Sequence, residues 1–272
     1  MRIGVVAPSS RFSEEAAARV RKIAAARRPD LEIVFHPQCF LTHGHFAGTD
    51  AARAAAFVEM ANDPGFDALW FARGGYGACR MAEDAIALLS PAARDKTYLG
   101  YSDAGYLLAG LYRAGFPHLA HGPMPQDAMR AGGEAAVERA LDWLGDRAPA
   151  ALEPGLEPGR RHAAFNITVY GLLLGTPLEP DLSGHILLLE EVAEHMYRID
   201  RAMFHIAGNE AVQRVAGIRL GRCSEVPEND PDFGESDESV VRFWCARAGV
   251  EWLGRADIGH DSANKVVPFG SL

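Results

Sequence analysis

Residues 97–114 read TYLGYSDAGYLLAGLYRA and place a serine between a short apolar segment and an amphipathic one. The pattern predicts a strand over 97–101 and a helix over 103–114. A sharp strand-to-helix turn needs small neighbours and exposes the hydroxyl of its serine, here Ser102. The N–H of Asp103 then faces the same space, and the helix N-terminus adds positive charge that favours an oxyanion. A plain helix cap at Ser102, with Asp103 in the first turn, is the alternative.

Strands and helices alternate through the first half of the chain around this segment. The expected strands are 3–7, 31–36, 66–71, 97–101 and 118–121, and the expected helices are 14–26, 50–62, 76–89, 103–114 and 134–143. Such alternation is typical of βαβ units and predicts an α/β fold with a mainly parallel sheet. Ligands of such sheets bind beyond the carboxyl ends of the strands, where Ser102 and the turn at 73–77 both lie.

Residues 150–161, AALEPGLEPGRR, mark a domain boundary. Proline and glycine at this density oppose both helix and central strand. We therefore expect one domain over 1–149, a linker over 150–161 and a second domain over 162–272. The second half is less regular. The expected elements there are a strand running into a helix over 162–173, strands over 186–189 and 215–220, helices over 197–207 and 238–248, and an acidic surface loop over 225–236.

The composition of the 272 residues is that of an ordinary globular protein, with 48% hydrophobic and 23% charged residues. A formal net charge of −9 disfavours nucleic acid as a partner. The apolar run at the N-terminus is short for a signal peptide, and no segment has the length of a membrane span. The four cysteines form no C-x-x-C pair. We expect a cytoplasmic protein with free thiols and no membrane partner.

A glycine-rich turn follows the expected strand 66–71, with the sequence Arg73-Gly74-Gly75-Tyr76-Gly77. Glycine lets backbone N–H groups approach a ligand closely, so this turn suits either a second oxyanion donor or a phosphate. It lacks the lysine of a P-loop and the spacing of a dinucleotide fingerprint. A purely conformational turn is the alternative.

Two further segments offer the partners that a nucleophilic serine requires. Glu190 ends an apolar run, and His260 lies in a glycine-containing loop near the C-terminus. Ser, Glu and His in this order form one known order of a catalytic triad, although each residue alone also fits an exposed loop or strand end. His43 and His45 hint at a metal, but two ligands are too few for a site.

The chain resembles the LD-carboxypeptidases, the muramoyltetrapeptide carboxypeptidase family of serine peptidases. The resemblance extends over nearly the whole chain. The blocks that carry it are, in order, 6–9 (VAPS), 46–50 (FAGTD), 73–77 (RGGYG), 100–103 (GYSD), 121–124 (HGPM), 174–177 (LGTP), 189–191 (LEE), 197–201 (YRIDR) and 259–260 (GH). So many blocks in one order are more specific than any single motif.

The resemblance implies a Rossmann- or flavodoxin-like α/β sandwich followed by a smaller β-rich α/β domain. It implies that Ser102 is the nucleophile, His260 the general acid/base and Glu190 its orienting partner. The backbone N–H groups of Gly75 and Asp103 would form the oxyanion hole. The family uses no metal or organic cofactor, and its members are cytoplasmic homodimers. The implied substrate is a small murein peptide, cut between meso-diaminopimelate and D-alanine in peptidoglycan recycling.

Substrate contacts are less specified by the sequence. Arg73 is our candidate for binding the terminal carboxylate, and Asn166 is a second candidate for substrate binding. Ala164 and Phe165 stand where the family usually has two glycines, and we expect them to narrow or reshape the pocket. The family's Leu-Glu-Asp block reads Leu-Glu-Glu here, which leaves Glu191 as the alternative to Glu190.

Three other functions compete with murein peptide cleavage. Microcin C immunity peptidases resemble the same family and cut an amide in an aminoacyl-nucleotide, although we find no clear insertion for stacking adenine. A binding protein without catalysis would explain the altered segment at 164–166, but the three triad residues oppose it. An ordinary α/β-hydrolase esterase would share the serine turn and would favour short acyl esters.

Overall fold

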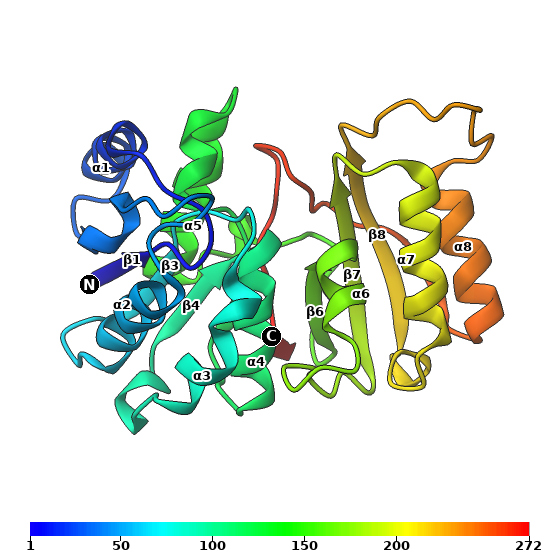
Figure 1. Ribbon diagram of the computed structural model, residues 1–272, viewed down its shortest axis with the longest axis horizontal. Helices are drawn as coiled ribbons and strands as arrows, with labels where there is room; N and C mark the ends of the chain where they lie inside the picture. The colour runs from blue at the N-terminus through cyan, green and yellow to red at the C-terminus, as the bar shows by residue number, and fades with distance from the viewer. Residues whose placement is uncertain (272) are drawn as a thin grey trace.

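The computed structural model describes residues 1–271, which form two lobes, each built on one sheet (Figure 1). The first sheet has the order β10-β5-β4-β3-β1-β2 and the second the order β11-β6-β7-β8-β9. The strands are β1 (Arg2–Val6), β2 (Glu32–Phe35), β3 (Ala68–Phe71), β4 (Thr97–Gly100), β5 (Leu119–His121), β6 (Arg161–Asn166), β7 (His185–Val192), β8 (Gly217–Ser224), β9 (Trp252–Arg255), β10 (Val267–Pro268) and β11 (Gly270–Ser271).

Eight α-helices are present in this part of the chain. They are α1 (Glu14–Arg27), α2 (Asp50–Asn62), α3 (Ala82–Ala87), α4 (Gly105–Arg113), α5 (Gly133–Asp146), α6 (Ile167–Leu173), α7 (Met196–Gly208) and α8 (Asp237–Ala248). None of them is long and apolar enough to cross a lipid bilayer.

The first sheet is parallel from β2 to β5 and is covered by helices on both faces. Successive side chains of a strand point to opposite faces, so Val5 and Trp70 pack with α1 and α5, whereas Val6 and Phe71 pack with α2 and α4. From the β2 edge, the parallel strands follow the order β2-β1-β3-β4-β5, so the direction in which the chain adds strands reverses between β1 and β3. Open α/β sheets bind their ligands at such a point. The predicted α/β fold is confirmed.

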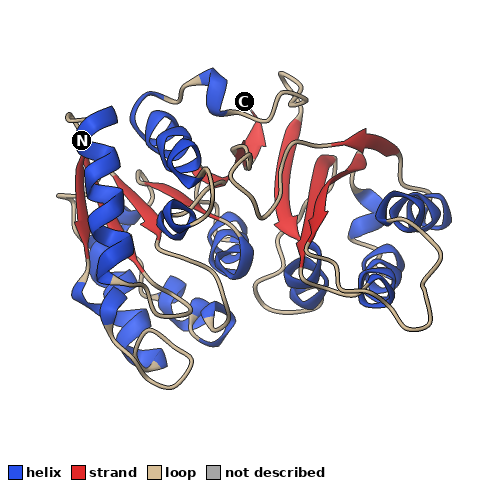
Figure 2. Cartoon of the chain, turned by 90° about the horizontal axis from the view of Figure 1, so that it is seen from above, coloured by secondary structure: helices blue, strands red, loops and turns tan. Residues whose placement is uncertain are grey.

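The second sheet is also mainly parallel, and its two faces are covered differently. Phe165, Leu187 and Leu189 point into the layer that contains α6 and α7. The alternate residues Ile186 and Leu188 pack instead against Ile258 and Val267 of the C-terminal segment (residues 256–271). Figure 2 shows the helices of this lobe on one side of its sheet.

The C-terminal segment joins the two sheets. β10 pairs antiparallel with β5 of the first sheet, and β11 pairs antiparallel with β6 of the second. In Figure 1 this segment, coloured red, runs between the lobes. The sequence did not predict β9, β10 or β11. β10 and β11 have only two residues each, which is too short to show a periodicity, and β9 is interrupted by Gly254 with a φ of +86°.

The predicted helix over 76–89 is wrong in its first half. Gly75 and Gly77 have φ values of +112° and +132°, which no right-handed helix contains. A short 3-10 turn over 78–80 follows, and α3 begins only at Ala82. The helix expected over 103–114 likewise begins later, at Gly105, because residues 102–104 form a 3-10 turn.

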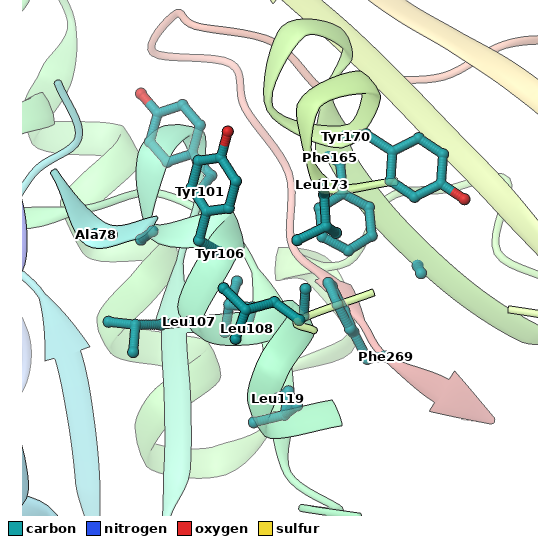
Figure 3. Packing of buried hydrophobic residues seen from close by; sticks show 14 of the residues in the cluster. Ala78, Tyr101, Tyr106, Leu107, Leu108, Leu119, Phe165, Tyr170, Leu173 and Phe269 are labelled. Atoms are coloured by element: carbon teal, nitrogen blue, oxygen red, sulfur yellow. The ribbon is translucent and has the colours of Figure 1, made fainter. Parts of the chain in front are cut away.

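An apolar layer fills the space between the lobes. Figure 3 shows Leu108 of α4 and Leu173 of α6 pointing into the same layer as the rings of Phe165 and Phe269. The Phe165 ring stacks on Tyr170 at 5.2 Å and meets Phe269 edge to face at 5.2 Å. Phe165, which was expected to narrow the substrate pocket, therefore serves the packing of the two lobes.

Phe165→Ala should lower the free energy of unfolding by about 3–5 kcal/mol, because it removes a buried ring from this layer. Urea unfolding followed by circular dichroism measures the change. Leu88→Ala is the control, since Leu88 is 65% exposed and its truncation should cost about 1 kcal/mol or less. Equal losses for the two variants would contradict the assignment of Phe165 to the core.

Candidate active site

Ser102 occupies the turn between β4 and α4 with a left-handed backbone. Its φ is +58°, a conformation that costs a residue other than glycine roughly 1–3 kcal/mol. Gly100 precedes it without room for a side chain, because a Cβ there would lie 2.7 Å from the ring of Phe71. A strained serine between small neighbours at a strand-to-helix turn is the arrangement of a nucleophile elbow.

The buried carboxylate of Asp103 holds this turn in place. Its Oδ2 accepts hydrogen bonds from the Ser9 hydroxyl at 2.5 Å and from the Ala78 N–H at 2.8 Å. Burial raises the pKa of Asp103, and these hydrogen bonds oppose the rise. Ser9 follows β1 and Ala78 follows the glycine turn, so one side chain joins three loops at the point where the strand order reverses.

The glycine turn lies directly against the serine. A Cβ built on Gly74 would lie 2.6 Å from Ser102 Oγ and 3.5 Å from the N atom of Asp103. A Cβ on Gly75 would lie 2.1 Å from the hydroxyl of Ser10. Only glycines let the backbone of the turn come this close to the serine hydroxyl.

Glu190 and His260 meet in the second lobe. His260 Nδ1 lies 2.5 Å from Oε2 of Glu190, and both side chains are buried, with exposed fractions of 7% and 0%. A carboxylate can only accept hydrogen bonds, so Nδ1 donates. The neutral ring then keeps its lone pair on Nε2, which is the atom that a general base uses.

The protonation of His260 depends on this pair. Burial lowers the pKa of His260, but the charge of Glu190 and its hydrogen bond raise it more, and the pKa lies above its ordinary value. Asp127 and Glu191 add smaller effects in the same direction. The imidazolium form is therefore favoured once the ring has accepted a proton.

Arg222 of β8 fixes the loop that carries His260. Its guanidinium donates to Asp261 on one side of the histidine and to Asp257 on the other, the latter at 2.6 Å. The Asn264 side chain accepts the N–H of Gly259 at 3.2 Å. Arg139 of α5 donates to the carbonyl of Asn264 at 2.9 Å, so the first lobe also holds this loop.

Glu191, which was the alternative to Glu190, has a different environment. Its carboxylate accepts from Asn166 Nδ2 at 2.5 Å and from the N–H and hydroxyl of Thr168 at 2.9 and 2.7 Å. The Oδ1 of Asn166 accepts from the N–H of Val169 and caps α6. Glu191 and Asn166 thus stabilise the start of α6, and only Glu190 reaches the histidine.

Arg73 lies at the start of the glycine turn and is half-buried. Its Nη1 donates to the carbonyl of Arg11 at 3.0 Å, and no carboxylate within residues 1–271 forms an ion pair with it. Burial lowers the pKa of Arg73. A guanidinium without an acidic partner is suited to binding an anionic group of a ligand.

The serine turn and the Glu190–His260 pair face each other across the lobes through Tyr101. The Tyr101 ring lies 4.8 Å from the His260 ring, centroid to centroid, and Ser102 is the next residue. No hydrogen bond joins the Ser102 hydroxyl to His260 within the part of the chain that the structure describes. Sequence reasoning missed Tyr101, Arg222 and Asn264, although Tyr101 belongs to the GYSD block.

The histidines that hinted at a metal serve other contacts. His45 Nε2 lies 3.1 Å from the Ser10 hydroxyl, and the backbone of His43 pairs with that of Phe46. Over residues 1–271 no three His, Cys, Asp or Glu side chains are grouped as metal ligands.

Comparison with known families agrees with the serine turn and the histidine loop. Residues 3–122 match the LD-carboxypeptidase N-terminal domain, and residues 162–272 match the LD-carboxypeptidase C-terminal domain. The chain belongs to the LD-carboxypeptidase family. This LD-carboxypeptidase family member is a serine-type peptidase, and the resemblance seen in the sequence is confirmed.

Individual relatives align over nearly the whole chain. A carboxypeptidase homologue of Streptomyces coelicolor is 36% identical, covering 99% of this chain and 88% of that protein. The murein tetrapeptide carboxypeptidase of Pseudomonas aeruginosa is 25% identical, with 99% and 91% covered.

Solved structures share the fold at lower identity. Muramoyltetrapeptide carboxypeptidase from Oxalobacter formigenes is 21% identical, with a TM-score of 0.81 and coverage of 99% of this chain and 93% of that one. The microcin C7 self-immunity protein in complex with aspartyl sulfamoyl adenosine is 19% identical, with a TM-score of 0.81 and coverage of 99% and 91%.

The Gly74→Ala variant should lose about 10²-fold in kcat/KM for amide hydrolysis, because its methyl carbon would lie 2.6 Å from Ser102 Oγ, inside van der Waals contact, and would push the hydroxyl from its position by about 1 Å. Gly208→Ala is the control, since nothing lies within 4 Å of a Cβ at that position. Steady-state kinetics on both folded variants measures the effect. Unchanged kinetics for Gly74→Ala would show that the turn does not constrain the serine.

The pH dependence should report the Glu190–His260 pair. His260 must be neutral to accept a proton, so kcat/KM should rise as pH rises through the elevated His260 pKa, with a midpoint above about 6.5. Glu190→Gln removes the carboxylate charge that raises the pKa of His260, which should move the midpoint down and lower the plateau by about 10²–10⁴-fold.

Glu191→Gln provides the matched control, because Glu191 lies next in the chain but bonds to Asn166 and Thr168. It should lower the melting temperature and move the midpoint less than Glu190→Gln does. NMR titration of the His260 ring gives the same pKa without substrate. A midpoint that both variants move equally would contradict the specific pairing with Glu190.

Proposed function

We propose that this peptidase hydrolyses the L,D amide bond between meso-diaminopimelate and D-alanine of a murein tetrapeptide, in peptidoglycan recycling. The observation that carries the proposal is the buried Glu190–His260 pair beside the strained turn of Ser102. The murein tetrapeptide carboxypeptidase of P. aeruginosa, aligned over 99% of the chain, supports the choice of substrate.

In the proposed reaction, Ser102 is the nucleophile and His260 the general base. His260 Nε2 takes the proton of the Ser102 hydroxyl as the oxygen attacks the carbonyl carbon of the scissile amide. The resulting imidazolium is stabilised by the Glu190 carboxylate at 2.5 Å, which also holds the ring in the tautomer that leaves Nε2 free. Substrate binding would have to bring Ser102 and His260 within hydrogen-bond distance.

The oxyanion of the tetrahedral intermediate would be bound by the backbone N–H groups of Gly75 and Asp103. Their placement is supported by the close approach of the glycine turn to Ser102 Oγ and to Asp103 N. The N-terminus of the following helix adds positive charge. His260 then protonates the amine of D-alanine, which leaves, and the acyl group stays on Ser102. Water attacks the ester by the reverse proton path and frees both Ser102 and the tripeptide.

Arg73 is our candidate for the terminal carboxylate of the substrate. It is a half-buried cation without an acidic partner among the described residues, one residue before the glycines that approach Ser102. Asn166 lies opposite Glu190 in the pairing of β6 with β7, and one of its two amide hydrogens is not used by Glu191. Asn166 is therefore our second candidate for substrate binding.

The proposal also includes a cytoplasmic homodimer. All four cysteines are free thiols, which fits a reducing compartment. Three large apolar side chains, Leu172, Phe204 and Phe243, are more than half exposed on the helices of the second lobe, as at a subunit interface. A substrate from peptidoglycan turnover would reach such an enzyme as a small soluble peptide.

Release of D-alanine from L-Ala-γ-D-Glu-meso-Dap-D-Ala tests the function. The purified protein should release it, and Ser102→Ala should lower kcat/KM by several orders of magnitude because the nucleophile is lost. Aspartyl sulfamoyl adenosine is the second substrate, because the microcin C7 self-immunity protein binds it.

Each result leads to one conclusion. D-Alanine release that depends on Ser102 supports the murein assignment. Ser102-dependent cleavage of the aminoacyl-nucleotide without D-alanine release transfers the assignment to the immunity type. Binding of either compound without turnover, by a folded protein, indicates a protein that has lost catalysis.

A further inference from the structure

Tyr101 packs against the proposed base and directly precedes the proposed nucleophile. Its ring is 2% exposed and lies 4.8 Å from the His260 ring at an interplanar angle of 56°. The same ring meets His121 at 5.4 Å in an edge-on arrangement. The fold thus places one aromatic side chain between the turn that carries Ser102 and the loop that carries His260.

The far end of the Tyr101 ring is anchored in the first lobe. Its hydroxyl donates to Oδ1 of Asp127 at 2.8 Å. Asp127 is buried, and it also accepts from the Met124 N–H at 2.8 Å and from Arg130 at 3.0 Å. An aspartate with three donors is itself rigidly held, so the long axis of the Tyr101 ring is fixed at both the Cα and the hydroxyl, and the contacts with His260 and His121 orient its plane.

The second ring contact leads to the same histidine loop. His121 Nε2 lies 3.3 Å from Oδ1 of Asn264, and that oxygen accepts the N–H of Gly259, the residue before His260. The Tyr101 ring therefore supports His260 directly and supports its loop through His121. The hydrogen bond from Glu190 constrains only one atom of the imidazole, Nδ1, so the tilt of the ring also depends on the side chains packed against it.

We propose that Tyr101 is a positioning residue that fixes the tilt of the His260 ring, so that Nε2 points toward Ser102. This role presupposes the serine mechanism proposed above. Tyr101 is joined to Ser102 by a peptide bond and packs against the ring of His260. A shift of Tyr101 therefore affects the positions of both the nucleophile, Ser102, and the base, His260. A misplacement of about 1 Å between reacting groups can cost about 10²-fold in rate.

Two substitutions at Tyr101 separate the ring from the hydroxyl. Tyr101→Leu removes the surface that supports the imidazole and should lower kcat about 10²-fold, with KM within about threefold of wild type. Tyr101→Phe keeps the buried ring and should retain kcat within about fivefold. Recovery by phenylalanine would attribute the effect to the ring.

Tyr98→Leu is the matched control for stability. Tyr98 lies three residues earlier on β4, is fully buried, and donates its hydroxyl to the carbonyl of Ala93 without touching His260. It should lose a similar free energy of unfolding while the folded enzyme keeps the wild-type kcat. Thermal unfolding of all the variants gives the folded fraction used to normalise the rates.

A proton NMR signature tests the geometry without substrate. The Nδ1 proton between His260 and Glu190 should give a resonance far downfield in the wild type, in Tyr101→Phe and in Tyr98→Leu. In Tyr101→Leu it should broaden or move upfield, because the ring is no longer held.

The outcomes keep the two proposals distinct. Absence of any hydrolysis by the wild type would refute the catalytic function, and loss of the resonance in Tyr101→Leu alone would still support the positioning of His260. Wild-type kcat and an unchanged resonance in Tyr101→Leu would overturn the role of Tyr101. Equal losses of kcat in Tyr101→Leu and Tyr98→Leu would overturn it as well.

Discussion

The hydrogen bond between Glu190 and His260 is the interaction on which the rest of the site depends. A carboxylate buried without a partner is strongly destabilising, and within residues 1–271 the second oxygen of Glu190, Oε1, has no hydrogen-bond partner. The imidazole must therefore stay in place if the charge is to remain buried. This requirement explains why the His260 loop is held by its own Asn264, by Arg222 of β8 and by Arg139 of α5.

The side chains of β7 show how the fold selects one of two adjacent glutamates. Strand alternation places Glu190 on the face of Leu188 and Ile258, and Glu191 on the face of the helices. Opposite Glu190, β8 carries an extra residue between Leu220 and Cys223. Such a bulge redirects side chains, and here it lies at Arg222, the clamp of the histidine loop. Glu190 thus accepts the hydrogen bond of the imidazole, and Glu191 stabilises the start of α6.

The sequence predicted the parts of the fold whose signals are local or lengthy. The serine turn, the parallel first sheet and the strand before Glu190 each follow from an apolar run with a defined end. The predicted start of the helix at residue 76 was wrong because Gly75 and Gly77 have positive φ values, in a turn packed so closely against Ser10 and Arg53, far away in the chain, that no Cβ would fit. The roles of Arg222 and Tyr101 could not be predicted, because an arginine or tyrosine on a strand does not indicate which distant loop it contacts.

The two lobes must dock before the proposed catalytic residues can act together, since Ser102 belongs to the first sheet and Glu190 to the second. The chain enforces this docking with its last residues: His260 precedes β10 by only seven positions, β10 pairs with β5, and β5 pairs with β4 directly before Ser102. The chain therefore connects His260 through β10 to the first sheet, whose strand β4 precedes Ser102, and a hydrogen bond connects it to Glu190 of the second sheet. Weakening the apolar layer between the lobes would separate nucleophile from base without altering either residue, so packing at Phe165 and Phe269 is a condition for the proposed chemistry.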